Sequence, residues 1–305
     1  MVSAGDPAWP RPAGPGPVVA VGKLVADQLL ELSAPLVAGG QQRVERTTTA
    51  GGAPANVTAG VARLGAPARF AGWAGADPLA DGLLAGLARR GVELAVVRRG
   101  RAPLSTVLVH ADGERTVLTD RGEGGLEPAD VRPEWFAGAA VVHLDGYDLL
   151  RFPDAVRAAA GTAHDLGVPV SADVAAAARI ERHGADGYVE LLAGLRPDVL
   201  CCDAAEATAL GLDSALPTWA PPLVLVHAGA RPTRVVTAAG TVEVPVEPLP
   251  AGGPRDTTGC GDAFAAGLLT GWRAGVPVLD AVRTGHAAAA VVAGVVGGQP
   301  PLSGA

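Results

Sequence analysis

The sequence predicts an α/β protein in which helices cover both faces of a mostly parallel β-sheet. The main observation is that short apolar runs alternate with amphipathic helical patterns, most regularly from residue 139 onward. The chain has 305 residues, of which 49% are hydrophobic and 18% charged, so it can bury a large core. We expect a single domain over residues 17–300, preceded by a flexible, proline-rich N-terminal tail over residues 1–16.

The N-terminal part of the domain contributes one strand and two helices. The apolar run at residues 18–22 is typical of a buried strand in a parallel sheet. Apolar residues at helical spacing then predict helices over residues 54–64 and 78–90, and Pro54 suits the first turn of the former.

Two segments depart from this rhythm and predict a second, smaller sheet. Residues 103–121 contain two β-rich runs, 106–110 and 115–119, around a turn that includes Asp112-Gly113, which is a hairpin pattern. Residues 27–49 also lack helical spacing. We therefore expect both segments to form a small β-sheet lid on the main domain.

The C-terminal part alternates strands and helices. The expected strands are residues 139–144, 168–173, 198–202 and 223–227. The expected helices between them are residues 153–166, 187–195 and 203–211. A hairpin near residues 233–246 and two helices, about 261–275 and 277–294, close the chain. Ligands of such sheets bind outside the carboxyl ends of the strands, so we expect the functional site there.

Charge and cysteine content exclude several classes of function. The net charge of −7 and the pI near 5.4 argue against partners that are nucleic acids or anionic membranes. Lys23 is the only lysine, so a phosphate-binding Gly-x-x-x-x-Gly-Lys loop is excluded. Cys201, Cys202 and Cys260 lack the spacing of a zinc site, and we expect a reduced, cytoplasmic protein. The apolar run 287–298 is too short to span a bilayer.

The stretch from Asp256 to Asp262 is the most informative run in the chain. Its small residues at positions 259–261 let backbone N–H groups converge where a helical pattern begins, which is an arrangement that binds phosphate. Asp262 would oppose a bound anion, but it suits a base that deprotonates a hydroxyl attacking phosphorus. The alternative is an ordinary helix start with an acidic residue in its first turn.

A second motif, from Gly51 to Asn56, leads into the predicted helix at residues 54–64. Gly51 and Gly52 allow a ligand to approach the backbone closely, and Asn56 offers both a donor and an acceptor. This chemistry suits a polyhydroxylated ligand. The alternative is a turn followed by an asparagine near a helix start.

The two motifs together resemble the two signatures of the ribokinase-like (PfkB) carbohydrate kinases. The first likeness runs from Gly51 through Gly65 to Gly75, and the second covers residues 256–269. The resemblance implies a Rossmann-like domain with a β lid, and transfer of the γ-phosphoryl group of ATP to a hydroxyl of a small carbohydrate of the fructose, ribose or sugar-acid type. The alternatives are a nucleoside kinase of the same family and a sugar- or nucleotide-binding homologue without turnover.

The resemblance also implies roles for individual residues. It makes Asp262 the catalytic base and the backbone amides of Gly259, Cys260 and Gly261 an anion hole. The implied sugar-binding residues are Asp27, Gly51, Gly52 and Asn56. The implied nucleotide-binding residues are Asp203, Glu206, Gly229 and His286.

The same resemblance implies metal ions, and the expected lid offers a place for a partner subunit. It implies ATP and Mg²⁺ as cofactors, with Glu206 organising the metal through water, and Asp256 helping to bind a monovalent cation such as K⁺. Mg²⁺ would supply positive charge that a chain with one lysine lacks. The partner is a small sugar, and the edge strands of the lid are places where a homodimer can form.

Several residues depart from the family pattern. Cys260 replaces a small residue, usually alanine, and we expect its thiol to make the enzyme sensitive to oxidation. Asp203 and His286 each replace an asparagine, and Arg231-Pro232 replaces a common Lys-Gly pair.

The substrate-specific features of the sequence conflict. The residues of the first motif, Gly-Gly-Ala-Pro-Ala-Asn-Val, favour fructokinase-like members. Asp173 lacks the following Asn and Arg that fructokinase-like and sugar-acid kinase-like members often carry; Arg179 or Arg182 could substitute, unless each is simply a solvated helix arginine. Asp145 is either a sugar contact or a loop carboxylate.

Overall fold

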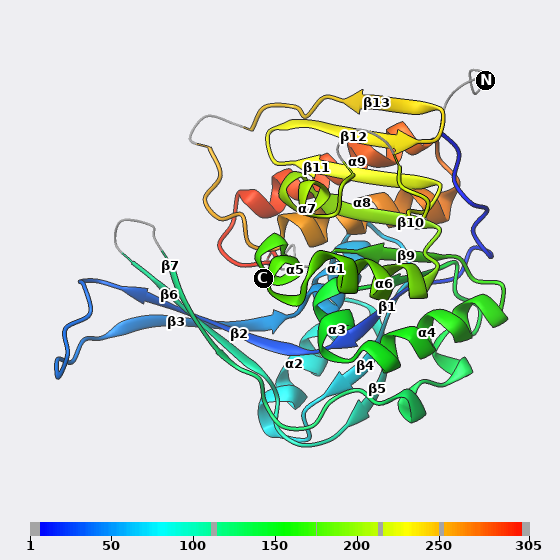
Figure 1. Ribbon diagram of the computed structural model, residues 1–305. Coiled ribbons are helices and arrows are strands. Elements are labelled where there is room, and N and C mark those ends of the chain that lie inside the picture. Colours follow the sequence, from blue (N-terminus) through cyan, green and yellow to red (C-terminus); the bar gives the residue numbers. More distant parts are fainter. Residues whose placement is uncertain (1–6, 111–114, 175, 213–215, 250–252, 301–305) are drawn as a thin grey trace.

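The computed structural model describes residues 7–110, 115–174, 176–212, 216–249 and 253–300 (Figure 1). These residues form a nine-stranded main sheet and a separate four-stranded sheet, which we call the lid sheet. The strand order of the main sheet is β13-β12-β11-β10-β9-β8-β1-β4-β5, parallel from β5 to β11, with β12 and β13 antiparallel. The predicted α/β fold with a mostly parallel sheet and a small second sheet is confirmed.

The main sheet contains every strand that the apolar runs predict, and two more. Its strands are β1 (Val18–Lys23), β4 (Ala68–Ala74), β5 (Val92–Arg98), β8 (Val141–Leu144), β9 (Val170–Asp173), β10 (Val199–Asp203), β11 (Leu223–Ala228), β12 (Arg231–Thr237) and β13 (Gly240–Val244). The sequence pattern does not single out β4 and β5. Arg69 interrupts the apolar run of β4, and Glu93 that of β5; in the fold the two side chains pair at 2.8 Å.

Helices cover both faces of the main sheet, as Figure 1 shows. Apolar side chains of α1 (Ala53–Arg63), α2 (Pro78–Arg89), α8 (Cys260–Ala274) and α9 (Val278–Ala293) pack on one face. The other face is covered by α3 (Gly146–Arg151), α4 (Pro153–Asp165), α5 (Ala177–His183), α6 (Ala185–Leu195) and α7 (Ala204–Ala209). Two 3₁₀ turns, η1 (Pro128–Asp130) and η2 (Pro133–Trp135), precede β8. Burial of both faces explains why strands such as β1 are apolar throughout.

The lid sheet consists of β2 (Val25–Leu32), β3 (Val44–Gly51), β6 (Leu104–Val109) and β7 (Arg115–Asp120), in the order β3-β2-β6-β7. In Figure 1 these strands project away from the main sheet. The predicted Asp112-Gly113 turn lies outside the described residues. Because β2 follows β1 after one residue, and β3 leads directly into α1, the root of the lid sheet adjoins the main sheet.

The segment before β1 packs against α8. The Trp9 and Trp272 rings stack with centroids 5.2 Å apart. Trp9 Nε1 donates to Val276 O at 2.8 Å, and Trp272 Nε1 donates to Pro10 O at 2.7 Å. Arg273 Nε donates to Gly16 O at 2.7 Å. Residues 7–16 therefore have fixed partners, and the expectation of a flexible tail needs correction for them; stacking and indole hydrogen bonds outweigh the proline-rich composition.

In the part of the chain that the structure describes, none of the helices is long and apolar enough to cross a membrane.

Candidate active site

Acidic side chains gather where β8, β9 and β10 end, beside the start of α8. Asp145 follows β8, Asp173 ends β9, and Asp203 ends β10. Burial raises the pKa of Asp173 well above its usual value, and the charges of Glu206, Asp262 and Asp145 raise it further. These mutual effects place the carboxyl groups in one region, at the strand ends where the topology predicts a site.

Asp262 lies in the first turn of α8 and is bonded to Asn56 of α1. Asn56 Nδ2 donates to Asp262 Oδ2 at 2.8 Å, and Gln299 Nε2 donates to Asn56 Oδ1 at 3.0 Å. Asn56 and Gln299 are both buried. The chain Gln299–Asn56–Asp262 thus fixes the orientation of the carboxylate and leaves its Oδ1 atom available for another partner.

The pKa of Asp262 is suited to a base at neutral pH. Burial raises it to about 7, the hydrogen bond from Asn56 lowers it, and the charges of Asp145 and Asp27 raise it. A carboxylate with such a pKa can accept a proton near pH 7 and release it again.

The turn before α8 brings backbone N–H groups close to Asp262. Gly259 adopts φ 75° as the N-cap of α8, and a Cβ atom there would lie 2.6 Å from Gly298 Cα, so this position requires glycine. The N–H of Cys260 donates to Thr257 O at 3.2 Å, which closes the turn. The helix N-terminus adds partial positive charge beside the carboxylate.

Asp256 joins this turn to the segment after α9. Its Oδ1 atom accepts from the N–H of Thr258, and its Oδ2 atom accepts from the N–H of Gly297, both at 2.7 Å. The side chain is buried. Both carboxylate oxygens are therefore engaged in holding the loop together.

The structure corrects the expectation of a reactive Cys260. Its Sγ atom lies 3.7 Å from Ala289 O and packs against a small cluster of Ala263, Ala288 and Val292. Burial raises the pKa of the thiol to about 11, and the charges of Asp256 and Asp262 contribute to the rise. At neutral pH the thiol stays protonated, so it lacks the thiolate character that oxidation requires.

Asp27 of β2 lies beside Gly51 of β3, the neighbouring strand of the lid sheet. A Cβ atom on Gly51 would lie 2.1 Å from Asp27 Oδ2, so glycine leaves the space that this carboxylate occupies. Burial raises the pKa of Asp27 to about 6. Gly52 follows as the N-cap of α1, with φ 88°. Because the charge of Asp27 also acts on Asp262, the predicted sugar-binding and catalytic residues share one region.

Asp203 and Glu206 cap the start of α7 reciprocally. The N–H of Asp203 donates to Glu206 Oε2, and the N–H of Glu206 donates to Asp203 Oδ1, both at 2.8 Å. Burial raises the pKa of Glu206 to about 8, the backbone hydrogen bond lowers it, and the charges of Asp203 and Asp145 raise it. The capping pair uses one oxygen of each carboxylate.

Aromatic side chains lie next to the Asp203–Glu206 pair, since His227 of β11 is opposite Asp203 of β10. Phe264 has its ring centroid 5.3 Å from that of His227 and 5.6 Å from that of His286. His286 Nε2 and Thr233 Oγ1 are 2.8 Å apart. Gly229 forms the turn between β11 and β12 with φ 63°. Gly229 and His286 thus belong to neighbouring elements near the carboxyl end of β11.

Sequence reasoning missed several residues of this region. Gln299 stands in a short Gly-rich segment after α9, where no pattern marks it. Lys23 Nζ forms a 2.5 Å ion pair with Asp148 Oδ1, and the N–H of Lys23 donates to Asp148 Oδ2 at 2.8 Å. Arg179 was named from the sequence as a substitute for the arginine missing after Asp173, and its guanidinium carbon lies 5.0 Å from the ring centroid of Tyr147. The position of Lys23 at the end of an apolar strand is the one signal that the sequence offered.

The fold and the site define a phosphotransferase that acts on an alcohol group. The pfkB family carbohydrate kinase model matches residues 18–304, so the chain belongs to this family of sugar kinases. A fructokinase from Klebsiella pneumoniae is 31% identical over 262 residues, which cover 74% of this chain and 78% of the relative. An ATP-dependent ribose-1-phosphate kinase from Halopiger xanaduensis is 33% identical over 258 residues, covering 82% of each.

Solved structures of the same fold cover almost the whole chain. An adenosine kinase from Sinorhizobium meliloti superimposes with a TM-score of 0.81 at 25% identity, covering 95% of this chain and 97% of the other. A ribokinase II structure from E. coli in complex with ATP and Mg²⁺ has a TM-score of 0.77 at 19% identity, covering 93% and 94%. The latter likeness establishes the fold alone.

Proposed function

We propose that this protein transfers the γ-phosphoryl group of ATP to a hydroxyl of a small carbohydrate, with Asp262 as the catalytic base. The observation that carries the assignment is the Gln299–Asn56–Asp262 chain at the start of α8. It orients a carboxylate whose pKa is raised to about 7 next to a turn rich in backbone N–H groups. The family membership supports the reaction type.

The reaction then follows from the positions of these groups. Asp262 accepts the proton of the acceptor hydroxyl, whose oxygen forms the new bond to phosphorus while the bond to the ADP leaving group breaks. The N-terminus of α8, with the amides of Gly259, Cys260 and Gly261, stabilises negative charge on the transferring group. Catalysis is chiefly positioning and charge stabilisation, which is what a rigid anion turn supplies.

Asp27 and the glycine pair are proposed to hold the sugar. Asp27 projects into the space that Gly51 leaves, and its carboxylate accepts hydrogen bonds from sugar hydroxyls. Asn56 is already bonded at both ends of its amide, so its main task is to orient Asp262, with one N–H left for the sugar. The Klebsiella and Halopiger relatives, named as kinases of fructose and ribose 1-phosphate, support a carbohydrate acceptor.

Asp203, Glu206, Gly229 and His286 are proposed to bind the nucleotide. The second oxygens of Asp203 and Glu206 are hard donors of the kind that Mg²⁺ or its water shell prefers, so the donor set fits this metal. Bound Mg²⁺ would supply positive charge to the phosphates. The E. coli structure, which contains ATP and Mg²⁺, supports this donor and metal.

Further features of the proposal concern K⁺, assembly and location. Asp256 joins the turn before α8, at Thr258, to the segment after α9, at Gly297, and these two segments would surround K⁺, although the Asp256 carboxylate is itself engaged. Val117 and Leu118 of β7 are 56% and 55% exposed, which favours a homodimer through the lid sheet. We also propose a cytoplasmic location, because the three cysteines are free.

A nucleoside kinase is the second candidate. The likeness to the Sinorhizobium adenosine kinase over 95% of the chain favours it. The lid strands, which carry no aromatic side chain, favour the sugar.

The test is ADP release with Mg-ATP across ketoses, aldoses, sugar acids, sugar phosphates and nucleosides. Asp262→Asn should lower kcat by roughly 10²- to 10⁴-fold, because it removes the base without changing the shape of the side chain. Asp280→Asn, which changes an exposed carboxylate of α9, is the matched control and should leave kcat unchanged. Absence of acceptor-dependent turnover across the panel would overturn the proposed function.

A further inference from the structure

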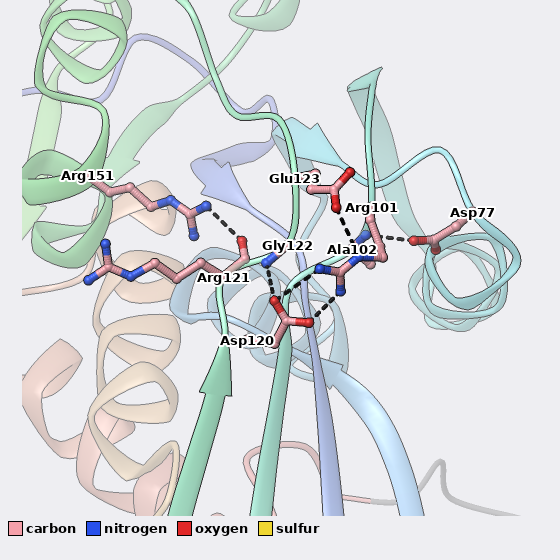
Figure 2. Close-up of polar contacts among 8 residues, drawn as sticks. All are labelled: Asp77, Arg101, Ala102, Asp120, Arg121, Gly122, Glu123 and Arg151. Carbon is pink, nitrogen blue, oxygen red and sulfur yellow. Dashed lines mark hydrogen bonds and ion pairs between the residues drawn. The ribbon is translucent and has the colours of Figure 1, made fainter.

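Two arginines at the root of the lid sheet have no part in the proposed function. Arg121 directly follows β7, and Arg151 is the last residue of α3. Arg151 Nη2 donates to Arg121 O at 2.7 Å. Burial lowers the pKa of Arg151, the charge of Asp148 raises it, and the charge of Arg121 lowers it, so the two guanidinium groups are close enough to repel. Figure 2 shows both side chains on the same side of the chain segment 120–123.

The strand register places Arg121 on the face of the lid sheet that carries Asp27. Asp27 of β2 lies opposite Ser105 of β6, and Ser105 lies opposite Thr119 of β7. Side chains alternate along a strand, so Arg121, two residues after Thr119, continues this face. Asp120 points to the opposite side. A ligand held by Asp27 therefore shares its side of the lid sheet with Arg121.

The backbone on both sides of Arg121 is held firmly. The Asp120 carboxylate pairs with the Arg101 guanidinium and accepts from the N–H of Gly122 at 2.9 Å (Figure 2). Arg101 and Glu123 exchange two backbone hydrogen bonds of 3.0 and 2.9 Å. Their side chains also form an ion pair. Arg121 thus projects from a fixed base, which limits the entropy it loses when it binds a ligand.

The positive charge at this point is only partly offset, by the carboxylate of Asp148. Asp148 is paired with Lys23, and neither Arg121 nor Arg151 forms a salt bridge within the part of the chain that the structure describes. Arg151 lies over the rings of Phe152 and Trp73, with its guanidinium carbon 4.9 and 5.5 Å from their centroids. Aromatic contact fixes the plane of the Arg151 guanidinium but supplies no anionic partner. Two like charges in one place cost free energy unless an anion lies between them.

We infer that the acceptor sugar carries an anionic group, a phosphate or a carboxylate, which Arg121 and Arg151 bind while a hydroxyl of the same molecule reaches Asp262. Guanidinium groups match the geometry of both oxyanions, so they select this charge class of acceptor over neutral sugars. The inference rests on the proposed function for the position of the acceptor, and it adds a specificity that the family alone does not determine.

The test measures acceptor binding by calorimetry without nucleotide, so that it does not depend on turnover. The probes are ribose 1-phosphate, ribose 5-phosphate and gluconate, with ribose and fructose as neutral counterparts. At least one anionic probe should bind wild-type protein more tightly than its neutral counterpart, and rising KCl should weaken this binding. Arg121→Gln and Arg151→Gln should each weaken it roughly 10- to 100-fold, while the affinity for neutral sugars changes little.

The matched control is Arg132→Gln, which removes an exposed arginine before η2 and should leave all affinities unchanged. Circular dichroism shows whether each variant is folded. Anionic probes that bind no better than neutral sugars, or that bind equally to the Arg121 and Arg151 variants, would overturn the anion site. Arginine-dependent anion binding without phosphorylation of any acceptor would support the site and refute the kinase reaction. ADP release with neutral sugars alone, unchanged in the Arg121 and Arg151 variants, would support the kinase reaction and refute the anion site.

Discussion

Asn56 of α1 donates a hydrogen bond to Asp262 of α8 at 2.8 Å, although the two residues are 206 positions apart in the chain. Each belongs to one of the two sequence motifs. The bond therefore connects the two motifs. It also couples the protonation state of Asp262, the proposed base, to the orientation of the Asn56 amide, which Gln299 holds in place.

The pH dependence of kcat is expected to report the pKa of Asp262. Asp262 must be ionised to accept a proton, so kcat should rise with pH through a midpoint near 7, the value to which burial raises this pKa. Asn56→Ala removes the hydrogen bond that lowers the pKa, so its midpoint should move upward. A pH profile of acceptor-dependent ADP release measures both; an unchanged midpoint in Asn56→Ala would contradict the assignment.

Stability should respond to Asp262 in the opposite direction from activity. The pKa of this carboxyl is about 7 in the folded state and near 3.8 when unfolded, so the folded state retains the proton more strongly. Its favourable contribution is complete below pH 3.8 and is lost as the pH rises through 7. Asp262→Asn should therefore raise the Tm at pH 8, by about 2–4 °C if the gain is about 1 kcal/mol, but not at pH 4. Calorimetry at both pH values checks this, and an equal gain at both would count against ionisation as the cause.

Gln299→Ala should lower kcat without a comparable change in the KM for ATP. The substitution frees Asn56 Oδ1, so the Asn56 amide no longer holds a single orientation toward Asp262. We expect a loss of roughly tenfold, the effect of about 1.4 kcal/mol on the barrier. Gln41→Ala, at an exposed position of the lid segment, is the matched control. Steady-state kinetics of both variants should separate them; equal losses would show that the effect is not specific to the site.

Cys260→Ala should retain activity, because the raised pKa of about 11 keeps the thiol protonated and its contacts are a small apolar cluster and two long sulfur contacts to backbone carbonyls. Iodoacetamide should accordingly modify Cys260 slowly at pH 7.5 compared with a free thiol of ordinary pKa. A time course analysed by mass spectrometry measures the rate at which Cys260 is alkylated. Rapid alkylation at pH 7.5 would show that burial does not protect this position.

Trp9→Ala should destabilise the fold and leave the chemistry intact. It removes the stack on Trp272 and the hydrogen bond to Val276 O, far from Asp262 in the sequence. We expect a loss of about 1–3 kcal/mol, or a Tm lower by about 2–4 °C for each kcal/mol. Thermal unfolding measures this. Ala8→Ser, at the exposed neighbouring position, is the control. Equal Tm values for the two variants would mean that the stack of Trp9 on Trp272 contributes nothing to stability.

The strand and helix pattern from residue 139 onward was predictable because both faces of the sheet are buried, which makes the strands apolar and the helices amphipathic. Strands β4 and β5 were not predictable, because Arg69 and Glu93 interrupt their apolar runs and look like surface charges in the sequence. Only the fold shows that the two side chains pair with each other. The role of Gln299 was also hidden, because a lone glutamine after a helix has no periodic or motif context.

The sequence by itself determined the family, the α/β layering and the presence of Asp262 and Asn56 as reactive and polar groups in two separate motifs. Local spacing and small residues suffice for these, since they set turns and helix starts. Only the tertiary structure decided the pKa of Asp262, the protonation of Cys260 and the convergence of Arg121 with Arg151. These properties depend on burial and on charges brought together from distant parts of the chain, which no local pattern records.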